Sequence, residues 1–437
     1  MKKLMLVCLV LLSSSSLLAQ TPLVSAIQRG DLARTEILLK NGADPNALLP
    51  DFSSPLAWSV AAQNPDMVEL LLKYGADSNL DKSVTKSFGP LVLACQHGNK
   101  QIVKLLLDAG ADARQSSSEG VSALALCAGS TDAATVRSLI VAGANTTRAN
   151  AEGQSPLMWA AAFGRSENLK PLIDSGADVN RLTNSGFSPL FFALQSRDAS
   201  TINALVDAGA NTNYSTPDGT SVVQMAMYQK QYKFAAELIR TGVDVAAYDR
   251  NGYQLLHAAV IADQPSLVKI LLENGANPNA LTGESKVVWR YEVNFTAAPY
   301  IVHPKPPMLL AAEQGSATMV KLLAEAGADL DFRSNDGNNL LLAAARSNPD
   351  TLASALKLTP NANVKNNDGR TALHLLLRIG TDSGITNDEI VTMFRMLKNY
   401  GAKIDIADAG GETATDLVLS NDFRAKKEFI AIFNPQM

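Results

Sequence analysis

The chain has 437 residues, of which 46% are hydrophobic and 18% are charged, a composition typical of a globular protein with a sizeable core. Lys and Arg number 38 against 42 Asp and Glu, so the formal net charge is -4, and no dense basic run occurs. This balance argues against DNA or RNA as a partner, because nucleic-acid binding normally leaves a basic footprint. With 4 His and 3 Cys, we expect no Cys/His metal cluster, no disulfide framework and no cofactor.

The first 19 residues have the layout of a secretory signal. Lys2 and Lys3 precede an apolar run from Leu4 to Leu12, and small residues lead to a predicted cleavage site after Ala19. The apolar run is shorter than the roughly 20 residues that a membrane-spanning helix needs, so a permanent anchor is the weaker interpretation. We therefore expect a periplasmic or secreted protein without stable membrane insertion.

The rest of the chain repeats the phrase Leu-Leu-x-x-Gly-Ala-Asp or Asn. Its glycines follow one another at intervals of 33 residues at Gly143, Gly176, Gly209, Gly242 and Gly275. The next one, Gly327, comes 52 residues after Gly275, which is one period plus an insertion of 19 residues. A fixed period of this length predicts an array of stacked units instead of several independent domains.

Each unit is predicted to contain two helices. Openings such as Ser155-Pro156-Leu157 predict a helix start, since the hydroxyl caps free N–H groups and Pro suits the first helical position. A Leu/Ala-rich helix is followed by a turn and by a second, amphipathic helix, for example Gln101 to Leu107. The glycine of Gly-Ala-Asp then supplies the left-handed residue that ends the second helix.

The 33-residue period, the Thr/Ser-Pro-Leu opening and the Gly-Ala-Asp close resemble ankyrin repeats, in about twelve units over essentially the whole mature chain. The resemblance implies an all-α solenoid of helix-turn-helix units with short β-hairpin fingers, which binds proteins. The opening His of the family is present only at His257 and His374. Residues such as Ala57, Val92 and Met158 replace it, so some openings are expected to lose a side-chain hydrogen bond.

The repeats and the insertion divide the chain into four parts. We expect a signal peptide at residues 1–19, ankyrin repeats 1–8 at 20–279, an aromatic β-hairpin insertion at 280–306, and repeats 9–12 with a C-terminal cap at 307–437. The cap is expected because the last repeat has no neighbour to cover its outer face. Charged residues in the last predicted helix, including Lys426, Lys427 and Glu428, fit that role.

Cys95 and Cys127 lie in the apolar first helices of two adjacent units. An oxidising compartment permits a disulfide between them. Stacked helices lie roughly 8–10 Å apart, however, and a disulfide needs Cα atoms within about 7 Å. We therefore expect two buried free thiols.

One group of aromatic residues is a candidate for partner binding. The residue two positions after the opening Leu is expected to point toward the concave side of the array. This position holds Trp58, Trp159, Phe192 and Met225, and Phe163 and Tyr228 follow one turn beyond. Large aromatics at such a face are the residue types that anchor protein interfaces. The alternative is that they pack between adjacent helices and close the core.

The insertion is the second candidate. It contains Trp289, Tyr291, Phe295 and Tyr300, and its alternating stretch 287–293 predicts a strand and hence an enlarged hairpin finger. Long loops in compact architectures are usually functional or disordered, and this one is too rich in aromatic and β-forming residues for disorder. The sequence leaves open whether the finger recognises a partner or packs over adjacent repeats.

No set of acid, base and nucleophile with a recognisable spacing is present, so an enzyme with a site between repeats is disfavoured. The sequence favours a noncatalytic exported scaffold, in a bacterial periplasm given the short Lys2-Lys3 signal, that binds a protein partner and is a monomer. The alternative is an inhibitor or immunity-type factor that blocks an exported enzyme through one compact patch.

Overall fold

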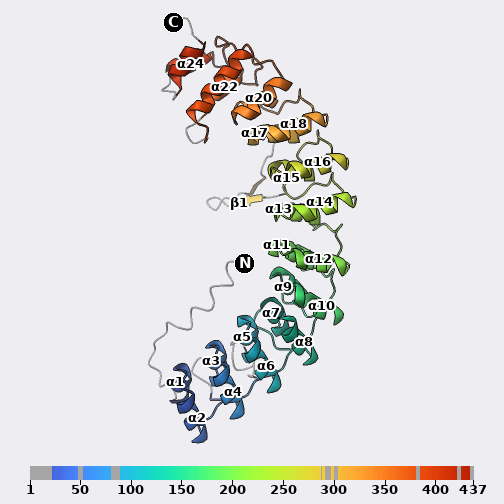
Figure 1. The fold of residues 1–437 in the computed structure, drawn as a ribbon, viewed down its shortest axis with the longest axis vertical. Coiled ribbons are helices and arrows are strands. Elements are labelled where there is room, and N and C mark those ends of the chain that lie inside the picture. Colours follow the sequence, from blue (N-terminus) through green and yellow to red (C-terminus); the bar gives the residue numbers. More distant parts are fainter. Residues whose placement is uncertain are drawn as a thin grey trace. The chain divides into compact units, whose positions relative to one another are not determined.

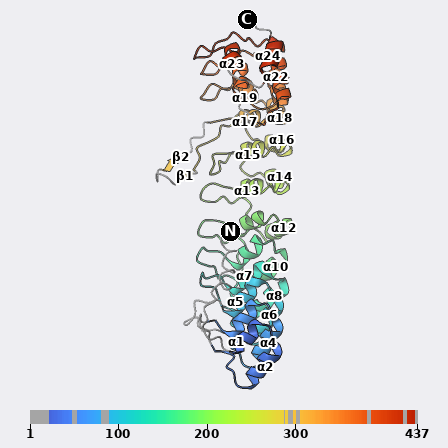
Figure 2. The ribbon, with the colours of Figure 1, turned by 90° about the vertical axis from the view of Figure 1, so that its left-hand side faces the viewer.

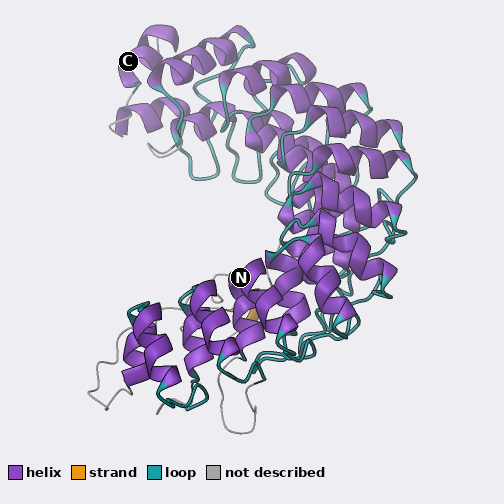
Figure 3. Ribbon diagram, turned by 60° about the horizontal axis from the view of Figure 1, so that its bottom comes forward, coloured by secondary structure: helices purple, strands orange, loops and turns teal. Residues whose placement is uncertain are grey.

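The structure is a computed structural model that describes residues 22–47, 53–79, 89–286, 288–290, 297–299, 304–379, 384–420 and 425–433. The chain divides into two compact units: unit 1 ends at Asn211 and unit 2 begins at Thr212. Each unit is a stack of helix pairs, and helices make up almost all of its regular structure (Figure 3). Within a unit, the odd-numbered helices form one row, the first-helix row, and the even-numbered helices form the second-helix row (Figure 1).

Unit 1 contains six helix pairs among its described residues. Its first-helix row consists of α1 (Pro22–Gln28), α3 (Pro55–Ala61), α5 (Pro90–His97), α7 (Ala123–Ser130), α9 (Pro156–Ala162) and α11 (Pro189–Ser196). Its second-helix row consists of α2 (Leu32–Lys40), α4 (Pro65–Lys73), α6 (Lys100–Asp108), α8 (Ala133–Val141), α10 (Ser166–Asp174) and α12 (Ala199–Asp207).

Unit 2 repeats this plan. Its first-helix row consists of α13 (Val222–Tyr228), α15 (Leu255–Ile261), α17 (Pro307–Gln314), α19 (Leu340–Ala344), α21 (Ala372–Leu377) and α23 (Ala414–Ser420). Its second-helix row consists of α14 (Tyr232–Arg240), α16 (Pro265–Glu273), α18 (Ala317–Glu325), α20 (Pro349–Leu358), α22 (Asn387–Asn399) and α24 (Lys426–Phe433). The short strands β1 (Val288–Arg290) and β2 (Ala297–Pro299) pair antiparallel, with Trp289 opposite Ala298.

The openings start the first helices as the sequence predicts. The Ser54 hydroxyl accepts a hydrogen bond from the Ala57 N–H at 3.1 Å, and Pro55 occupies the first helical position. At one opening that lacks the family His, another side chain makes part of the bonding. The Met158 sulfur accepts the Ser155 N–H at 3.4 Å, and so replaces one of the bonds that a histidine would make.

Asparagine side chains connect consecutive pairs on the loop side of the stack. Asn79 donates from Nδ2 to the Gly110 carbonyl at 2.8 Å, and its Oδ1 accepts the Asp112 N–H at 2.6 Å. Asn279 makes the same two bonds, to Gly327 at 3.1 Å and from Asp329 at 2.7 Å. Because the insertion lies between these partners in the sequence, the bridge shows that the stack continues beneath it.

The prediction of two free thiols is wrong, because Cys95 on α5 and Cys127 on α7 form a disulfide with their Cα atoms 4.5 Å apart. Both cysteines are completely buried. The equivalent positions on α9, the next first helix, hold the small residues Ala161 and Ala160. Small side chains at these positions let neighbouring backbones approach more closely than the axis-to-axis spacing suggests. The spacing argument therefore failed at this point.

The base of the insertion packs on preceding loops of unit 2. The Gly283 N–H donates to the Gly252 carbonyl at 2.7 Å, and the Lys286 N–H donates to the Arg250 carbonyl at 2.8 Å. The Lys286 ammonium donates to the Asp218 carbonyl at 3.3 Å, in the loop one repeat earlier. From this base, β1 and β2 project beyond the other loops of the unit (Figure 2).

An aromatic cluster lies between the last two second-row helices of unit 2. Phe394 on α22 contacts Phe429 on α24 with ring centroids 5.2 Å apart, and Phe433 lies 4.8 Å from Phe429. The opposite side of α24 exposes Lys427 and Glu428 to solvent. Helix α24 therefore has one apolar side, which packs on α22, and one charged side, which faces solvent.

Candidate functional site

A row of large apolar side chains runs along the first helices of unit 1. Successive helices α3 to α11 place half-buried residues at one equivalent position, namely Trp58, Leu93, Leu126, Trp159 and Phe192. Each residue follows two positions after the fully buried Leu of its helix, so the two side chains point in different directions. Each of these side chains packs partly against its neighbours and leaves part of its surface exposed, so partner binding by this row stays a prediction.

Trp159 and Phe163 form the most exposed part of this row. Their rings are stacked with centroids 6.0 Å apart and an interplanar angle of 22°, and Phe163 is 57% exposed. Gly129 on α7 makes room for Phe163, because a Cβ there would lie 2.8 Å from the phenyl ring. The Trp159 indole N–H is buried, and the described residues offer it no hydrogen-bond acceptor. The two stacked rings thus form a continuous aromatic surface on the first-helix side of unit 1.

Trp58 is the other indole of the row. Its N–H donates to the Ser53 hydroxyl at 2.8 Å, so the ring is held in place at the start of α3. A fixed, half-exposed indole loses little side-chain entropy when a partner covers it, which is why such residues anchor interfaces.

A cavity of about 450 Å³ lies beside Phe192. Two loops and α11 form its walls, with Ala151, Glu152, Gln154, Thr183, Asn184, Ser185, Phe187, Phe191, Phe192 and Gln195 as the lining residues. Glu152 is the one charged residue among them. Sequence reasoning identified Phe192 but missed the loop residues, because amides and hydroxyls in turns carry no pattern of their own.

The charge distribution separates the two rows of unit 1. None of its described first helices contains Asp, Glu, Lys or Arg, whereas every second helix contains at least one. Removing water from an uncharged surface with aromatic side chains requires little free energy, whereas burying charges without partners has a large free-energy penalty. Covering the first-helix row of unit 1 therefore costs less desolvation free energy than covering its second-helix row.

In unit 2, the candidate Tyr228 is 39% exposed, and its hydroxyl donates to the carboxylate of the buried Asp249. Burial, together with this neighbouring carboxylate, raises the pKa of the Tyr228 phenol, which stays protonated as a donor. Met225, one turn earlier on α13, is half-buried. Tyr228 thus links its helix to the next loop and exposes one face of its ring.

The candidates in the insertion lie mostly outside the described residues. Tyr291, Phe295 and Tyr300 fall there, and Trp289 is placed only through its backbone in β1. Whether these aromatic side chains meet a partner stays a prediction, although the base of the insertion packs on neighbouring loops.

The two opening histidines are structural. Nδ1 of His257 accepts the Gln254 N–H at 3.2 Å, and its Nε2 donates to the Ala280 carbonyl at 3.0 Å. Burial lowers the pKa of His257 to about 4, and burial also lowers the pKa of His374. Both rings stay neutral near pH 7 and connect an opening to the following loop.

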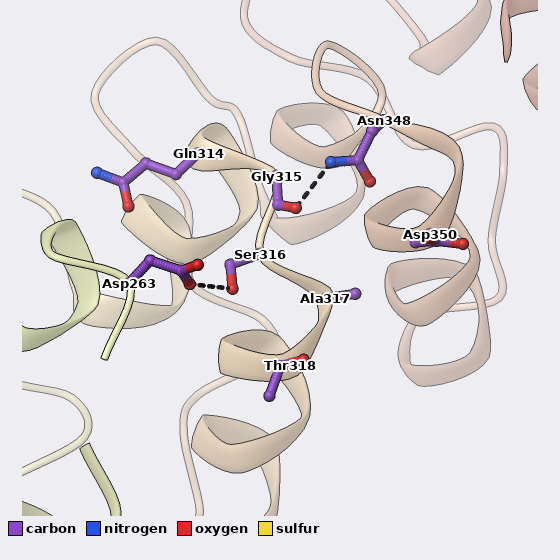
Figure 4. Close-up of a pocket in the computed structure, with 8 residues that line it drawn as sticks. All are labelled: Asp263, Gln314, Gly315, Ser316, Ala317, Thr318, Asn348 and Asp350. Carbon is purple, nitrogen blue, oxygen red and sulfur yellow. Dashed lines mark hydrogen bonds between the residues drawn. The ribbon is translucent and has the colours of Figure 1, made fainter. Parts of the chain in front are cut away.

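A second cavity, of about 560 Å³, lies where three successive helix-to-helix turns of unit 2 meet (Figure 4). The Ser316 hydroxyl donates to Asp263 at 2.8 Å, and the Asn348 amide donates to the Gly315 carbonyl at 2.7 Å. Asp350 lies on the far side of the cavity (Figure 4). These two hydrogen bonds join consecutive helix-to-helix turns to one another.

Neither a metal-ligand cluster nor a membrane-spanning helix occurs among the described residues. These residues contain no group of three or more His, Cys, Asp or Glu side chains that could hold a metal ion. No helix within the described ranges is long and apolar enough to cross a membrane.

The chain belongs to the ankyrin repeat family. A model of three consecutive ankyrin repeats matches residues 3–82, 60–150, 91–183, 124–216, 190–282 and 308–408. The expected fold, an ankyrin-repeat solenoid, is thereby confirmed. Ankyrin repeats typically form noncatalytic scaffolds for protein interaction, and they imply a protein partner.

Two known proteins are similar to parts of this chain. The chain is 29% identical over 142 residues to the E3 ubiquitin-protein ligase KEG of Arabidopsis thaliana, a match that covers 30% of this chain and 8% of the ligase. The chain therefore spans only a small part of that relative. The human ASB11 ankyrin repeat domain is 25% identical with a TM-score of 0.42, over 47% of this chain and 92% of that domain.

Proposed function

We propose that this protein is a noncatalytic, exported scaffold that binds a protein partner through the first-helix face and the loops beside it. The first-helix row of unit 1 carries this proposal, because it lacks charge and presents Trp58, Trp159, Phe163 and Phe192. A purely solvated surface does not need such residues, whereas interfaces use them as anchors. In this proposal the protein acts as a monomer, without nucleic acid and without a membrane-inserted part.

Export is supported by two features that lie far apart in the chain. The layout of residues 1–19 is that of a secretory signal, and its short Lys2-Lys3 start favours a bacterial periplasm. The disulfide between Cys95 and Cys127 is of the kind that persists in oxidising compartments and is rare in the cytosol. A periplasmic or secreted location accounts for both.

The second candidate is an inhibitor or immunity-type factor for an exported enzyme. The cavity beside Phe192 favours it, because one compact, aromatic-lined site could take a single side chain or loop of an enzyme. In that case one target would bind tightly at this cavity, and substitutions at distant residues such as Trp58 would leave its affinity unchanged.

Site-specific photo-crosslinking tests the scaffold proposal. A photoreactive phenylalanine analogue is placed at Phe163, which is 57% exposed on the first-helix side, or at Val141, which is 88% exposed at the end of α8. Irradiation in intact cells should give a defined protein adduct from position 163 and none from position 141. Equal adduct patterns, or none from position 163, would contradict binding at the first-helix face.

The mature N-terminus tests export independently. Mass spectrometry of the native protein should find a chain that begins after Ala19, in a periplasmic or secreted fraction. An intact Met1 in a purely cytoplasmic pool would reject export and leave the binding surface untouched.

A further inference from the structure

Three arginines occupy successive loops of unit 1. Arg114 lies between α6 and α7, Arg148 between α8 and α9, and Arg181 between α10 and α11. Each follows the Gly-Ala-Asp or Gly-Ala-Asn close of its repeat by two or three residues, so repeat geometry places them in line along one edge of the stack. We call these three residues the arginine row.

Backbone groups hold the three guanidinium groups in place. Arg148 donates to the Arg114 carbonyl at 3.2 Å and to the Ser116 hydroxyl at 3.3 Å. Arg181 makes the equivalent contact one repeat later, where it donates to the Thr147 carbonyl at 2.7 Å. Arg114 reaches the Gly143 carbonyl at 3.3 Å. These bonds use only part of the five N–H donors of each guanidinium and restrict its rotamers before any ligand arrives.

The arginine row lacks carboxylate partners. No described Asp or Glu lies within ion-pair distance of these three groups, in contrast to the second-helix row, where Lys104 pairs with Asp108 and Lys170 with Asp174. Asp112, at the start of the first loop, instead accepts the Arg114 backbone N–H at 2.9 Å. At the corresponding position of the middle loop the acid is replaced by Asn145, which leaves Arg148 without a carboxylate at the start of its loop.

We infer that the arginine row binds an acidic peptide segment of the protein partner. Arginine suits carboxylates because its planar fork matches their geometry, and the row presents three such forks already ordered. Three groups one repeat apart extend over roughly 20 Å, which an extended peptide of about seven residues covers. The net charge of -4 for the whole chain opposes long polyanions, so a short acidic segment fits better than nucleic acid. This inference rests on the proposed function and specifies the chemistry of the partner.

The first test uses a fluorescent peptide of about eight glutamates as the probe. The full mature chain should bind it with an affinity that falls as salt rises, because the contacts are charge pairs at the surface. The variant Arg114→Gln, Arg148→Gln, Arg181→Gln keeps donors on each side chain but removes the three charges. It should bind the peptide at least 10-fold more weakly.

A matched variant controls for net charge. Lys104→Gln, Arg137→Gln, Lys170→Gln removes three cations from the second helices of the same unit, and its affinity should stay within about 2-fold of the parent. Equal losses in the two variants would overturn the assignment. So would tighter, arginine-dependent binding of single-stranded DNA or inorganic polyphosphate than of the glutamate peptide. Thermal melts of both variants confirm that each is folded.

The natural partner separates this inference from the proposed function. If position 163 crosslinks a protein and the arginine variant lowers its yield at least several-fold, both hold. If the yield is unchanged, the arginine row is not part of the interface, although the scaffold proposal survives. If position 163 crosslinks nothing, the scaffold proposal fails, and binding of the glutamate peptide alone cannot restore it.

Discussion

Asn279 and Gly327 are 48 residues apart in the sequence, yet the Asn279 side chain donates a hydrogen bond to the Gly327 carbonyl at 3.1 Å. The insertion therefore leaves the stack of repeats and returns to it without disturbing the contact between the two repeats on either side. Asn46 and Asn180, each four residues after the glycine of its repeat close, make the same bridge. Repeats 7 and 8 lack it, since Ala246 stands in its place.

Replacing Asn279 by Ala should destabilise unit 2 by about 1 kcal/mol, because the Gly327 carbonyl and the Asp329 N–H lose a shared partner at a partly solvated site. Conversely, Ala246→Asn should stabilise the junction of repeats 7 and 8 by about 0.5–1 kcal/mol. Urea unfolding measures both changes. Asn274→Ala is the control, since Asn274 bonds only within its own turn, to Ile270 at 2.8 Å, and it should change stability by less than either.

The stability of unit 2 should fall when the pH drops from about 6.5 to about 4. The pKa of His257 is lowered by burial to about 4, so over this range the unfolded chain binds a proton that the folded chain does not. Above pH 6.5 both states are neutral and the full stability is present. The loss at low pH is of the order of 3 kcal/mol for a shift of this size.

The variant His257→Gln isolates this effect. Gln224 already stands at the equivalent position one repeat earlier, where it accepts the Ser221 N–H at 2.7 Å and donates to the Ala247 carbonyl at 3.2 Å. Glutamine therefore supplies the same bonds without a titrating group. Chemical unfolding at pH 7 and pH 5 should show a smaller difference for the variant than for the parent. Identical differences would mean that His257 does not titrate on unfolding.

Removing the disulfide should weaken unit 1. Cys95→Ala with Cys127→Ala restores the small residues of the other repeats but frees a loop of 32 residues in the unfolded chain, at a cost of roughly 3–4 kcal/mol. Intact mass with and without alkylation detects the bond, and urea unfolding gives the stability. The native bond should resist reductants until the protein unfolds, because both cysteines are buried. Free thiols in the freshly isolated native protein would contradict the assignment.

Among the described residues, four turns between paired helices use a left-handed residue other than glycine, and Arg197 is one of them, with φ of 61°. Arg197→Gly should stabilise unit 1 by about 0.5–1 kcal/mol, since glycine adopts this conformation without the clash of a Cβ. The reverse change at the equivalent turn, Gly164→Ala, should destabilise, because its φ is 65° and a Cβ would approach Asp198 to 3.1 Å. Melting curves of the two variants should shift in opposite directions.

Most of the architecture could be predicted because the same local signals recur in every repeat. Ser54 with Pro55 starts a helix for reasons contained in three residues, and the period then fixes which helices are neighbours. The position of Phe163 could also be anticipated, because helical spacing alone separates it from the buried face. Local chemistry and periodicity suffice wherever neighbouring repeats contact each other in the standard way.

Distances between backbones could not be predicted from periodicity. The distance between Cys95 and Cys127 depends on the size of the side chains between their two helices. The average spacing of helix axes does not contain this information, so it gave the wrong prediction. The period does contain a usable signal, since the sequence separation of the two cysteines, 32, is one less than the 33-residue repeat. The loop residues around Phe192 were missed for a related reason, because a cavity between loops depends on backbone paths that turn residues specify only weakly.

The disulfide also determines how unit 1 responds to mechanical force. When a chain of stacked repeats is pulled from its ends, each repeat that detaches normally adds its full contour length. Here, the segment between Cys95 and Cys127 cannot extend while the bond persists, which withholds roughly 110 Å for the 32 residues involved. A single-molecule extension trace of the oxidised protein would therefore end about that much shorter than the trace of the reduced one, with α6 inside the protected segment.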